Sequence, residues 1–301
     1  MAVTATAATD PVRVSDDDTM SILCTSGEGA GQQPLLPVEA DPLTELAESK
    51  GDRRISVCIP ARNEAATVGP IVHSIVSTLT EGSGGVPLVD EVVVVDDGST
   101  DRTAAMAEQA GARVVTAHSP AGGKGQAMRS AIDATDGDLV VFVDADVTNF
   151  GPHFVTGLLQ PLLADGSVTL VKGFYQRPLH GTPDGGGRVT ELMARPVIDL
   201  LFPQLSSIEQ PLAGETAAPR WVLEKCELAD GYAVELALLI DVASRFGVET
   251  IAQVDLGVRI HRNRPLTELR PQATDILRAA LARAPSSALG RLAADQPTGT
   301  E

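Results

Sequence analysis

Between residue 53 and about residue 146, continuous apolar runs typical of buried strands alternate with stretches whose apolar residues have helical spacing. The apolar runs ISVCIPARNE (55–64), EVVVVDD (91–97) and DLVVFVDAD (138–146) predict three buried strands. Apolar residues at helical spacing predict an amphipathic helix after the first strand: Val68, Ile71, Val72, Ile75 and Leu79. STDRTAAMAEQA predicts a second helix, capped by Ser99 or Asp101 and closed by Gly111. A short strand at 113–115 and a helix at about 124–135 complete this series.

The alternation of strands and helices predicts an α/β fold. The strands are apolar on both faces, which is typical of a mainly parallel, Rossmann-like sheet covered by helices on both sides. Ligands of such sheets bind at the carboxyl ends of the strands. Three of these ends carry polar residues, in the stretches PARNE, DDGS and DAD. We therefore expect a binding site along this edge.

The two ends of the chain lack sustained periodicity. Residues 1–50, rich in Ala, Thr, Asp, Gly and Pro, predict a flexible N-terminal arm, within which DPLTELAESK (41–50) has the character of a short helix. Residues 286–301 predict a flexible tail.

The charge, aromatic content and cysteine pattern of the chain indicate which partners and which cellular compartment to expect. A net charge of −17 and an aromatic content of 3% disfavour binding to nucleic acid or to an anionic membrane surface. No apolar run reaches the length of a membrane span, and the N-terminus lacks the profile of a signal peptide. The cysteines Cys24, Cys58 and Cys226 are far apart and odd in number, which favours a reducing compartment. We expect a cytoplasmic protein.

Two common nucleotide motifs are absent. The first strand is followed by PARNE instead of a G-x-G-x-x-G turn, and HSPAGGKGQ lacks the leading glycine and the hydroxyl residue of a P-loop.

The pair Asp144 and Asp146 indicates a candidate metal site. In an extended segment both carboxylates face one side, which suits a divalent cation that is also held by substrate phosphates. The alternative is a solvated strand end with turn-forming aspartates.

Together, PARNE, VVDDGSTD, the GKG loop and VFVDAD resemble the nucleotide-sugar-dependent glycosyltransferases of the GT-A fold, over about residues 53–150. The resemblance implies that Asp96 or Asp97 reads the donor base, that Lys124 approaches the diphosphate, and that Asp146 binds the metal. The donor-binding residues that it implies are Pro60, Ala61, Arg62, Glu64, Asp96, Ser99, Lys124, Asp144 and Ala145.

Several blocks between residues 168 and 270, above all GGGRVTEL (185–192) and HRNRPL (261–266), resemble the actinobacterial glucosyl-3-phosphoglycerate synthases. The resemblance implies retaining transfer of glucose from UDP-glucose to the 2-hydroxyl of D-3-phosphoglycerate, with Mg²⁺ or alternatively Mn²⁺. It also implies a homodimer and a product that leads to glucosylglycerate and methylglucose polysaccharides.

The resemblance also implies that residues 51–150 form the donor-binding half and residues 151–285 a C-terminal acceptor-binding half. The implied acceptor-binding residues are Gly187, Arg188, Val189, Thr190, Tyr232, Glu235 and Asn263. The implied catalytic residues are Asp146, Lys124 and Glu235.

The residues of the second half support an anion site independently. The glycine run precedes a predicted helix start, where backbone N–H groups with Arg188 and Thr190 can bind a phosphate or carboxylate. The alternative is a flexible loop with a solvated arginine.

His261 resembles the third metal ligand of the family. The alternative role of His261 is a structural hydrogen bond. If His261 ligates, activity should fall as the pH drops through 6 to 7, because only neutral imidazole binds metal.

Four other functions compete with this hypothesis. A related transferase would use GDP-mannose, GDP-glucose or a different small anionic acceptor. A nucleotidyltransferase would carry a glycine-rich basic loop after the first strand, and a polysaccharide synthase would add membrane spans and a Q-x-x-R-W-type motif. A non-enzymatic nucleotide-sugar binder would keep the sheet without needing GGGR and HRN.

Overall fold

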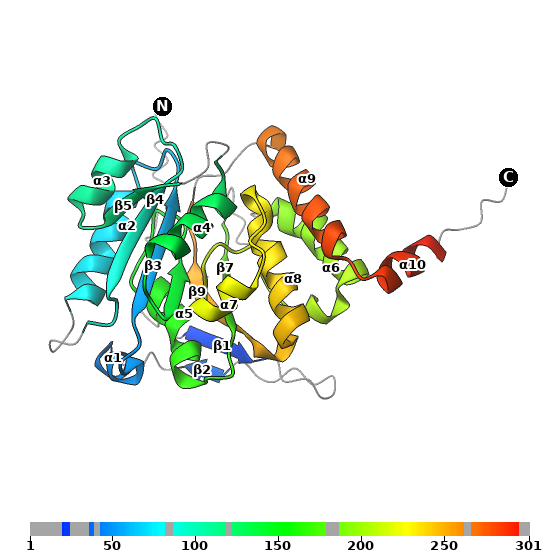
Figure 1. Cartoon of the computed structure of the whole chain (residues 1–301), viewed down its shortest axis with the longest axis horizontal. Helices are drawn as coiled ribbons and strands as arrows, with labels where there is room; N and C mark the ends of the chain where they lie inside the picture. Colours follow the sequence, from blue (N-terminus) through cyan, green and yellow to red (C-terminus); the bar gives the residue numbers. More distant parts are fainter. Residues whose placement is uncertain are drawn as a thin grey trace, which may run out of the picture.

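The computed structural model describes residues 20–24, 36–38, 43–81, 87–117, 122–178, 187–261 and 266–294. These residues form one mixed sheet with helices packed on both of its faces (Figure 1). The strands are β1 (Met20–Cys24), β2 (Leu36–Val38), β3 (Ile55–Ala61), β4 (Glu91–Asp96), β5 (Arg113–Thr116), β6 (Leu139–Phe142), β7 (Leu170–Gln176), β8 (Thr216–Pro219) and β9 (Ile251–Val258).

The sheet has the strand order β2-β1-β9-β7-β8-β6-β3-β4-β5. β3 pairs in parallel with both β4 and β6, and β7 pairs in parallel with β9. β8 is antiparallel to β6 and to β7, and β1 is antiparallel to β9 and to β2. Within the described chain, only β8 and β1 therefore run against the common direction. The prediction of a mainly parallel sheet is confirmed, and the carboxyl ends of β3, β4, β6, β7 and β9 share one edge.

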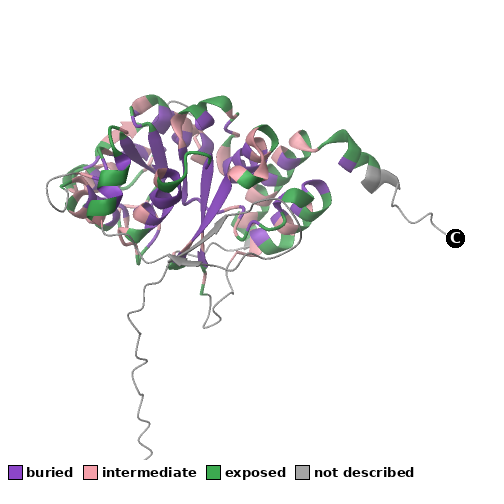
Figure 2. Cartoon of the chain, turned by 90° about the horizontal axis from the view of Figure 1, so that it is seen from below, coloured by how far each residue is buried: buried purple, intermediate pink, exposed green. Residues whose placement is uncertain are grey.

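Alternating side chains of the strands build two hydrophobic cores. On β3, Val57 and Ile59 contribute to one core and Cys58 to the other, as the period of two along a strand requires. The first core packs against α1 (Leu43–Lys50), α2 (Val68–Ile75), α3 (Thr103–Gln109) and α5 (His153–Ala164). The second packs against α4 (Lys124–Ala134), α6 (Arg195–Leu201), α7 (Arg220–Lys225), α8 (Val234–Phe246), α9 (Leu266–Arg283) and α10 (Ser286–Ala294). Figure 2 shows the buried strands between these two helical layers.

Local sequence signals account for the ends of the predicted elements. Val68, Ile71, Val72, Ile75 and Leu79 are all buried, and α2 continues as a π-helical turn, η1 (Val76–Thr80). The carboxylate of Asp101 accepts the backbone N–H of Thr103 at 2.9 Å at the start of α3. Ser99 instead accepts the N–H of Asn63, and the N-cap position is Arg102 without a side-chain cap, so of the two predicted residues only Asp101 contacts the helix start. Gly111 ends the segment with a φ of +103°, which favours glycine.

The predicted flexible ends differ from the structure where it describes them. β1 and β2 lie within the predicted arm and extend the sheet beyond β9 through antiparallel pairing. These strands satisfy the otherwise open edge of β9, a long-range contact that local patterning does not reveal. The short helix expected at 41–50 is confirmed as α1. Residues 286–294 of the predicted tail form α10, where Ala288 is buried; residues 295–301 lie outside the described residues.

The second half adds short helical turns between its longer elements. These are η3 (Thr190–Ala194), a π-helical turn, and the 3-10 turns η4 (Pro203–Leu205), η5 (Gly231–Ala233) and η6 (Val248–Thr250). None of the helices in the described ranges is both long enough and apolar enough to cross a bilayer. The sheet is continuous across residue 150, so the predicted division at that residue does not separate two hydrophobic cores.

Candidate active site

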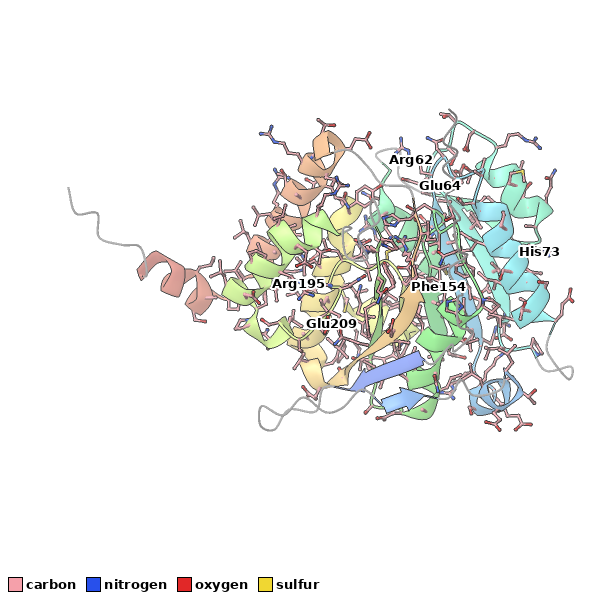
Figure 3. The ribbon with its side chains drawn as sticks, turned by 180° about the vertical axis from the view of Figure 1, so that it is seen from behind. Arg62, Glu64, His73, Phe154, Arg195 and Glu209 are labelled. Atoms are coloured by element: carbon pink, nitrogen blue, oxygen red, sulfur yellow. The ribbon has the colours of Figure 1, made fainter. Side chains whose placement is uncertain are left out.

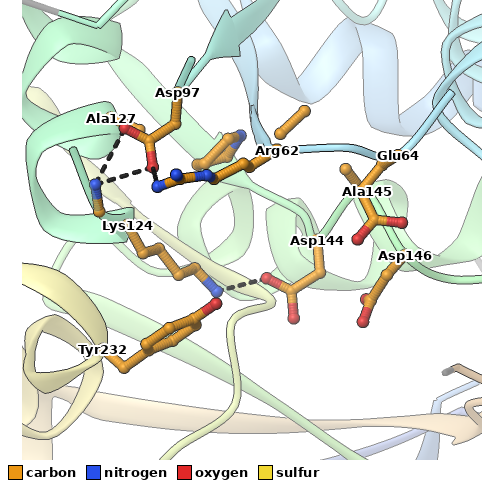
Figure 4. Close-up of a pocket in the computed structure, with 12 residues that line it drawn as sticks. Arg62, Glu64, Asp97, Lys124, Ala127, Asp144, Ala145, Asp146 and Tyr232 are labelled. Carbon is orange, nitrogen blue, oxygen red and sulfur yellow. Dashed lines mark hydrogen bonds and ion pairs between the residues drawn. The ribbon is translucent and has the colours of Figure 1, made fainter. Parts of the chain in front are cut away.

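A cavity lies at the carboxyl ends of β3, β4 and β6, where the parallel pairing brings the three polar strand ends together. Figure 4 shows its side chains converging from the strand ends, from the start of α4 and from Tyr232. Its lining comprises Pro60, Ala61, Arg62, Glu64, Asp97, Gly123, Lys124, Ala127, Asp144, Ala145, Asp146 and Tyr232. We call it the first cavity. Of the predicted donor-binding residues, all except Asp96 and Ser99 line it.

The two aspartates after β4 have different surroundings. Asp97 is buried and accepts the backbone N–H of Gly123 with both carboxylate oxygens, at 2.9 and 2.7 Å. Arg62 lies 3.8 Å from the same carboxylate. Asp96 instead accepts the N–H of Ser99 at 3.1 Å and closes the turn. Successive side chains point to opposite sides of a strand, so only Asp97 of this pair faces the first cavity.

Lys124 links the donor motif to the start of α8. Its ammonium group forms ion pairs with Asp144 and, at 2.9 Å, with Glu235. Burial opposes the charge on Lys124, but attraction to the two carboxylates outweighs burial and raises its pKa well above the usual value. Burial likewise acts to raise the pKa of Asp144, but Lys124 and Arg259 overcome it and hold that pKa well below its usual range. Lys124 is therefore a fixed cation at neutral pH.

A second cavity adjoins the first and shares Lys124, Asp144, Asp146 and Tyr232 with it. Its other lining residues are Arg177, Gly187, Arg188, Val189, Thr190, Leu212, Glu235, Arg259, His261, Leu269 and Gln272. All predicted acceptor-binding residues that the structure describes line this cavity; Asn263 lies outside the described residues.

The glycine run leads into a helix, as predicted. Gly187 has a φ of +76°, its carbonyl accepts the N–H of Glu191, and helical turns begin directly after it. Gly185 and Gly186 lie outside the described residues. The first N–H groups of a helix have no partner within that helix, so this end of the second cavity suits an anion.

The carboxylates of Asp144 and Asp146 come together, but not through an extended segment. Residues 145 and 146 form a turn after β6, which corrects the predicted geometry. One nitrogen of the Arg259 guanidinium bridges the two, at 2.7 Å from Asp144 and 2.8 Å from Asp146. Its Nε donates to Glu215 at 3.0 Å, and Glu215 also accepts the Tyr175 hydroxyl at 2.7 Å. A buried cation thus holds the pair in place.

Sequence reasoning missed three cations of this region. Arg177 and Arg259 directly follow β7 and β9, whose carboxyl ends reach the same edge as the aspartates. A basic residue immediately after a buried parallel strand was the available signal. Lys172, buried on β7, donates to the Ala213 carbonyl and, at 3.1 Å, to the Thr216 hydroxyl. Lys172 thereby holds the segment that carries Glu215, and burial lowers its pKa to about 8.

Asp146 and His261 both face the second cavity, so the convergence that metal binding requires is present. An antiparallel bridge joins Val147 to His261, and Thr148 donates to the Ile260 carbonyl at 2.9 Å. The described residues contain no group of three or more His, Cys, Asp or Glu side chains arranged around a metal position. If Asp146 and His261 bind a divalent ion, its remaining ligands would have to come from the donor diphosphate and water.

The imidazole of His261 is kept neutral by its surroundings. Burial, together with the charges of Arg259 and Arg177, lowers its pKa to about 4. A group with a depressed pKa stays uncharged until the pH approaches that lower value, so the burial of His261 favours a loss of activity at a lower pH than the predicted range of 6 to 7.

We therefore predict that His261 of the metal-free protein shows no protonation between pH 7 and 5.5. An NMR titration of imidazole resonances, assigned with His261→Gln, measures this directly. His73, which lies on α2 away from both cavities, serves as the internal control. A His261 midpoint at pH 6 or above would contradict the prediction.

Comparison with known proteins agrees with this geometry. The model of glycosyl transferase family 2 matches residues 56–197. The glucosyl-3-phosphoglycerate synthase of Mycolicibacterium smegmatis is 47% identical over 251 residues, covering 80% of this chain and 81% of the relative. The synthase of Petrotoga mobilis is 44% identical over 251 residues, covering 80% and 76% of the two chains. This chain belongs to the glucosyl-3-phosphoglycerate synthase family.

Solved structures of the Mycobacterium tuberculosis synthase share the fold. The complex with Mn²⁺, UDP and glucosyl-3-phosphoglycerate has a TM-score of 0.75 and 43% identity, covering 83% of this chain and 86% of that chain. The complex with Mn²⁺, UDP-glucose and phosphoglyceric acid has a TM-score of 0.72 and 45% identity, covering 80% and 83%. Another structure of the same enzyme contains Mg²⁺ and UDP. The GT-A expectation is thereby confirmed.

Proposed function

We propose that this chain transfers glucose from UDP-glucose to the 2-hydroxyl of D-3-phosphoglycerate, with retention of configuration. The observation that carries the proposal is the pair of adjoining cavities that share Lys124, Asp144, Asp146 and Tyr232. One is lined by most of the predicted donor-binding residues, and the other is lined by the predicted acceptor-binding residues that the structure describes. Membership of the synthase family supports this choice of substrates.

The charges around the shared residues suit departure of a diphosphate. Lys124 stays protonated and lies between the two cavities, where it stabilises negative charge that develops on the leaving group. Asp146 and His261 would hold the divalent ion, Mg²⁺ or Mn²⁺. When bound, the ion neutralises charge on the diphosphate as a Lewis acid.

The carboxylates of the site are already engaged, which disfavours a covalent nucleophile from the protein. Asp144 and Glu235 pair with Lys124, Asp146 pairs with Arg259, and Asp97 accepts from Gly123. We therefore assign proton removal from the acceptor hydroxyl to a phosphate oxygen of the donor, with attack from the face that the diphosphate leaves.

The acceptor phosphate belongs at the helix start after Gly187, beside Arg188. Loss of a charge-assisted contact to phosphate costs about 1.5–3 kcal/mol. We predict that Arg188→Ala raises the KM for 3-phosphoglycerate by about one to two orders of magnitude, while donor affinity stays near the wild-type value. Steady-state kinetics with each substrate varied in turn separates the two effects. Arg278→Ala, at an arginine with 74% exposure on α9, is the matched control. A weakened donor with an unchanged acceptor KM would assign Arg188 to the donor side.

Release of UDP from UDP-glucose with and without 3-phosphoglycerate tests the function as a whole. Release that depends on the acceptor, with the glucoside identified by mass spectrometry and its anomeric configuration by NMR, supports the proposal. The same assay with GDP-glucose and GDP-mannose tests the related transferase. Binding of UDP-glucose without acceptor-dependent release would instead establish a non-enzymatic binder.

The assembly and compartment are also proposals. We propose a homodimer, because leucines are exposed on neighbouring helical elements of the second half, and exposed apolar side chains gathered in this way favour an interface. They are Leu192, Leu200, Leu281 and Leu289. Light scattering on the intact chain measures the assembly. A cytoplasmic location agrees with the free cysteines Cys58 and Cys226.

A further inference from the structure

Gly214 is a buried glycine that lies against the ion pair of Lys124 and Asp144, although it lines neither of the two cavities. A Cβ atom at this position would lie less than 3.0 Å from three atoms, which are Asp144 Oδ1, Asp144 Cγ and Lys124 Nζ. Non-bonded carbon atoms are in ordinary contact at about 3.5–4.0 Å, so a side chain at position 214 and the present position of the ion pair exclude each other. The φ of Gly214 is not positive, so close packing, and not backbone conformation, requires the glycine here.

Strand pairing explains this close approach. β8 is antiparallel to β6, with Thr216 opposite Phe142, so the residues just before β8 lie beside the residues just after β6. Gly214 is thereby brought to Asp144, although the two are far apart in the sequence. Figure 3 labels Glu209, from which this segment leads to β8.

The backbone around Gly214 is held on both sides, which prevents it from moving to make room. The buried ammonium group of Lys172 donates to the carbonyl of Ala213. The fully buried carboxylate of Glu215 pairs with Arg259 at 3.0 Å. A side chain at position 214 would therefore displace the ion pair and not the chain that carries Gly214.

The two members of the ion pair are also held from their other sides. Lys124 Nζ lies 2.9 Å from Glu235 Oε1, and Asp144 Oδ2 accepts from Arg259 at 2.7 Å. Figure 4 shows the Lys124 side chain reaching Asp144 from the start of α4. Displacement of either end away from position 214 therefore breaks or lengthens one of these contacts.

We propose that Gly214 is a positioning residue for the transfer reaction. Its missing side chain provides the space in which Lys124 and Asp144 pair, and thereby fixes the Lys124 ammonium group between the two cavities. The inference rests on the proposed function, in which Lys124 stabilises the leaving diphosphate. A side chain at position 214 moves this ammonium group by about 1 Å, whereas the acceptor site at the helix start after Gly187 stays in place.

Gly214→Ala adds a single methyl group and tests the proposal with the smallest change. Misplacement of a reacting or catalytic group by about 1 Å can cost about 100-fold in rate. We expect kcat per folded molecule to fall about 10- to 100-fold, with the KM for 3-phosphoglycerate near the wild-type value. Circular dichroism gives the folded fraction. Gly166→Ala is the matched control and should keep wild-type turnover, because Gly166 is exposed in the turn after α5 and a Cβ atom there meets nothing within 4 Å.

A double-mutant cycle in urea identifies the atoms that the new methyl group meets, and it needs no substrate. Lys124→Ala combined with Asp144→Ala removes all three atoms that crowd position 214, together with one charge of each sign. Gly214→Ala should lower the urea midpoint of the wild-type protein, and it should lower the midpoint of this double variant by less.

Two results would overturn the proposal. One is wild-type kcat in folded Gly214→Ala protein. The other is a fall in the urea midpoint that is as large in the double variant as in wild type, because the methyl group would then meet other atoms. Absence of transfer to 3-phosphoglycerate by the wild-type protein would instead contradict the proposed function, and the cycle in urea would still measure the contact of Gly214 with the ion pair.

Discussion

Replacement of Asp146 with alanine is expected to abolish sugar transfer and to leave the fold intact. Asp146 lies in the turn after β6 and faces both cavities, so its carboxylate is placed to hold a divalent ion against the donor diphosphate. Loss of a partner that merely orients a metal ligand costs about 10- to 100-fold in activity. Loss of the ligand itself should therefore reduce turnover by more than about 100-fold.

The same substitution should cost little stability. Asp146 is 27% exposed, and its partner Arg259 keeps its contacts with Asp144 and Glu215 when the Asp146 carboxylate is removed. The buried guanidinium is thus never left without a counter-charge, and the expected change is within about 1 kcal/mol. Turnover with Mg²⁺ or Mn²⁺ and the free energy of unfolding in urea measure the two effects.

Asp133→Ala provides the matched control, because Asp133 is an exposed aspartate on α4 that lines neither cavity. It should retain wild-type turnover and stability. Unchanged turnover in Asp146→Ala, or full wild-type activity in EDTA, would contradict the assignment of Asp146 to the metal.

The donor edge could be predicted from the sequence because its causes are local. The apolar runs of β3, β4 and β6 indicate strands that are buried on both faces. Adjacent parallel strands necessarily bring their carboxyl ends to one edge. The same pattern could not decide between Asp96 and Asp97, because a shift of one residue reverses the side to which each points. The contacts of the folded chain separate the two: Asp97 accepts from Gly123 and lines the first cavity, whereas Asp96 accepts from Ser99 and does not line it.

The other half of the site depends on contacts between distant segments. Arg259 reaches Glu215, 44 residues earlier, and Asp144, 115 residues earlier. The reversed strand β8 has no local signature that distinguishes it from a parallel strand, yet Glu215 directly precedes it. The strands β1 and β2 are likewise defined by pairing and not by periodicity. Of the predicted acceptor-binding residues, the glycine run before a helix start indicated Arg188 and Thr190, whereas the others came only from the resemblance to the synthase family.

The largest effect on stability is expected at Glu215, a residue that sequence reasoning did not single out. Its side chain is fully buried, with 0% exposure, and it pairs with Arg259 at 3.0 Å while accepting the Tyr175 hydroxyl at 2.7 Å. Burial opposes the charge on Arg259, but attraction to Glu215, the largest favourable contribution, helps to raise the Arg259 pKa well above its usual value. Breaking a buried pair by removing one partner typically costs about 3–5 kcal/mol.

Glu215→Ala should therefore lower the free energy of unfolding by about 3 kcal/mol, the lower end of that range, because Asp144 and Asp146 still neutralise Arg259. Urea unfolding followed by circular dichroism measures this loss. Glu224→Ala, at a carboxylate with 55% exposure on α7, is the matched control and should change stability by less than about 0.5 kcal/mol.

A double-mutant cycle distinguishes the lost ion pair from the cavity that a smaller side chain leaves. If the pair dominates, Glu215→Leu combined with Arg259→Leu should be less destabilising than the sum of the single substitutions, by about 1–3 kcal/mol. The double variant contains neither a buried Glu215 without Arg259 nor an Arg259 without Glu215, unlike the two single variants. Strictly additive effects would show that Glu215 contributes through packing alone. In that case Arg259 would be held at Asp144 and Asp146 without help from Glu215, and Glu215→Gln should leave both turnover and stability unchanged.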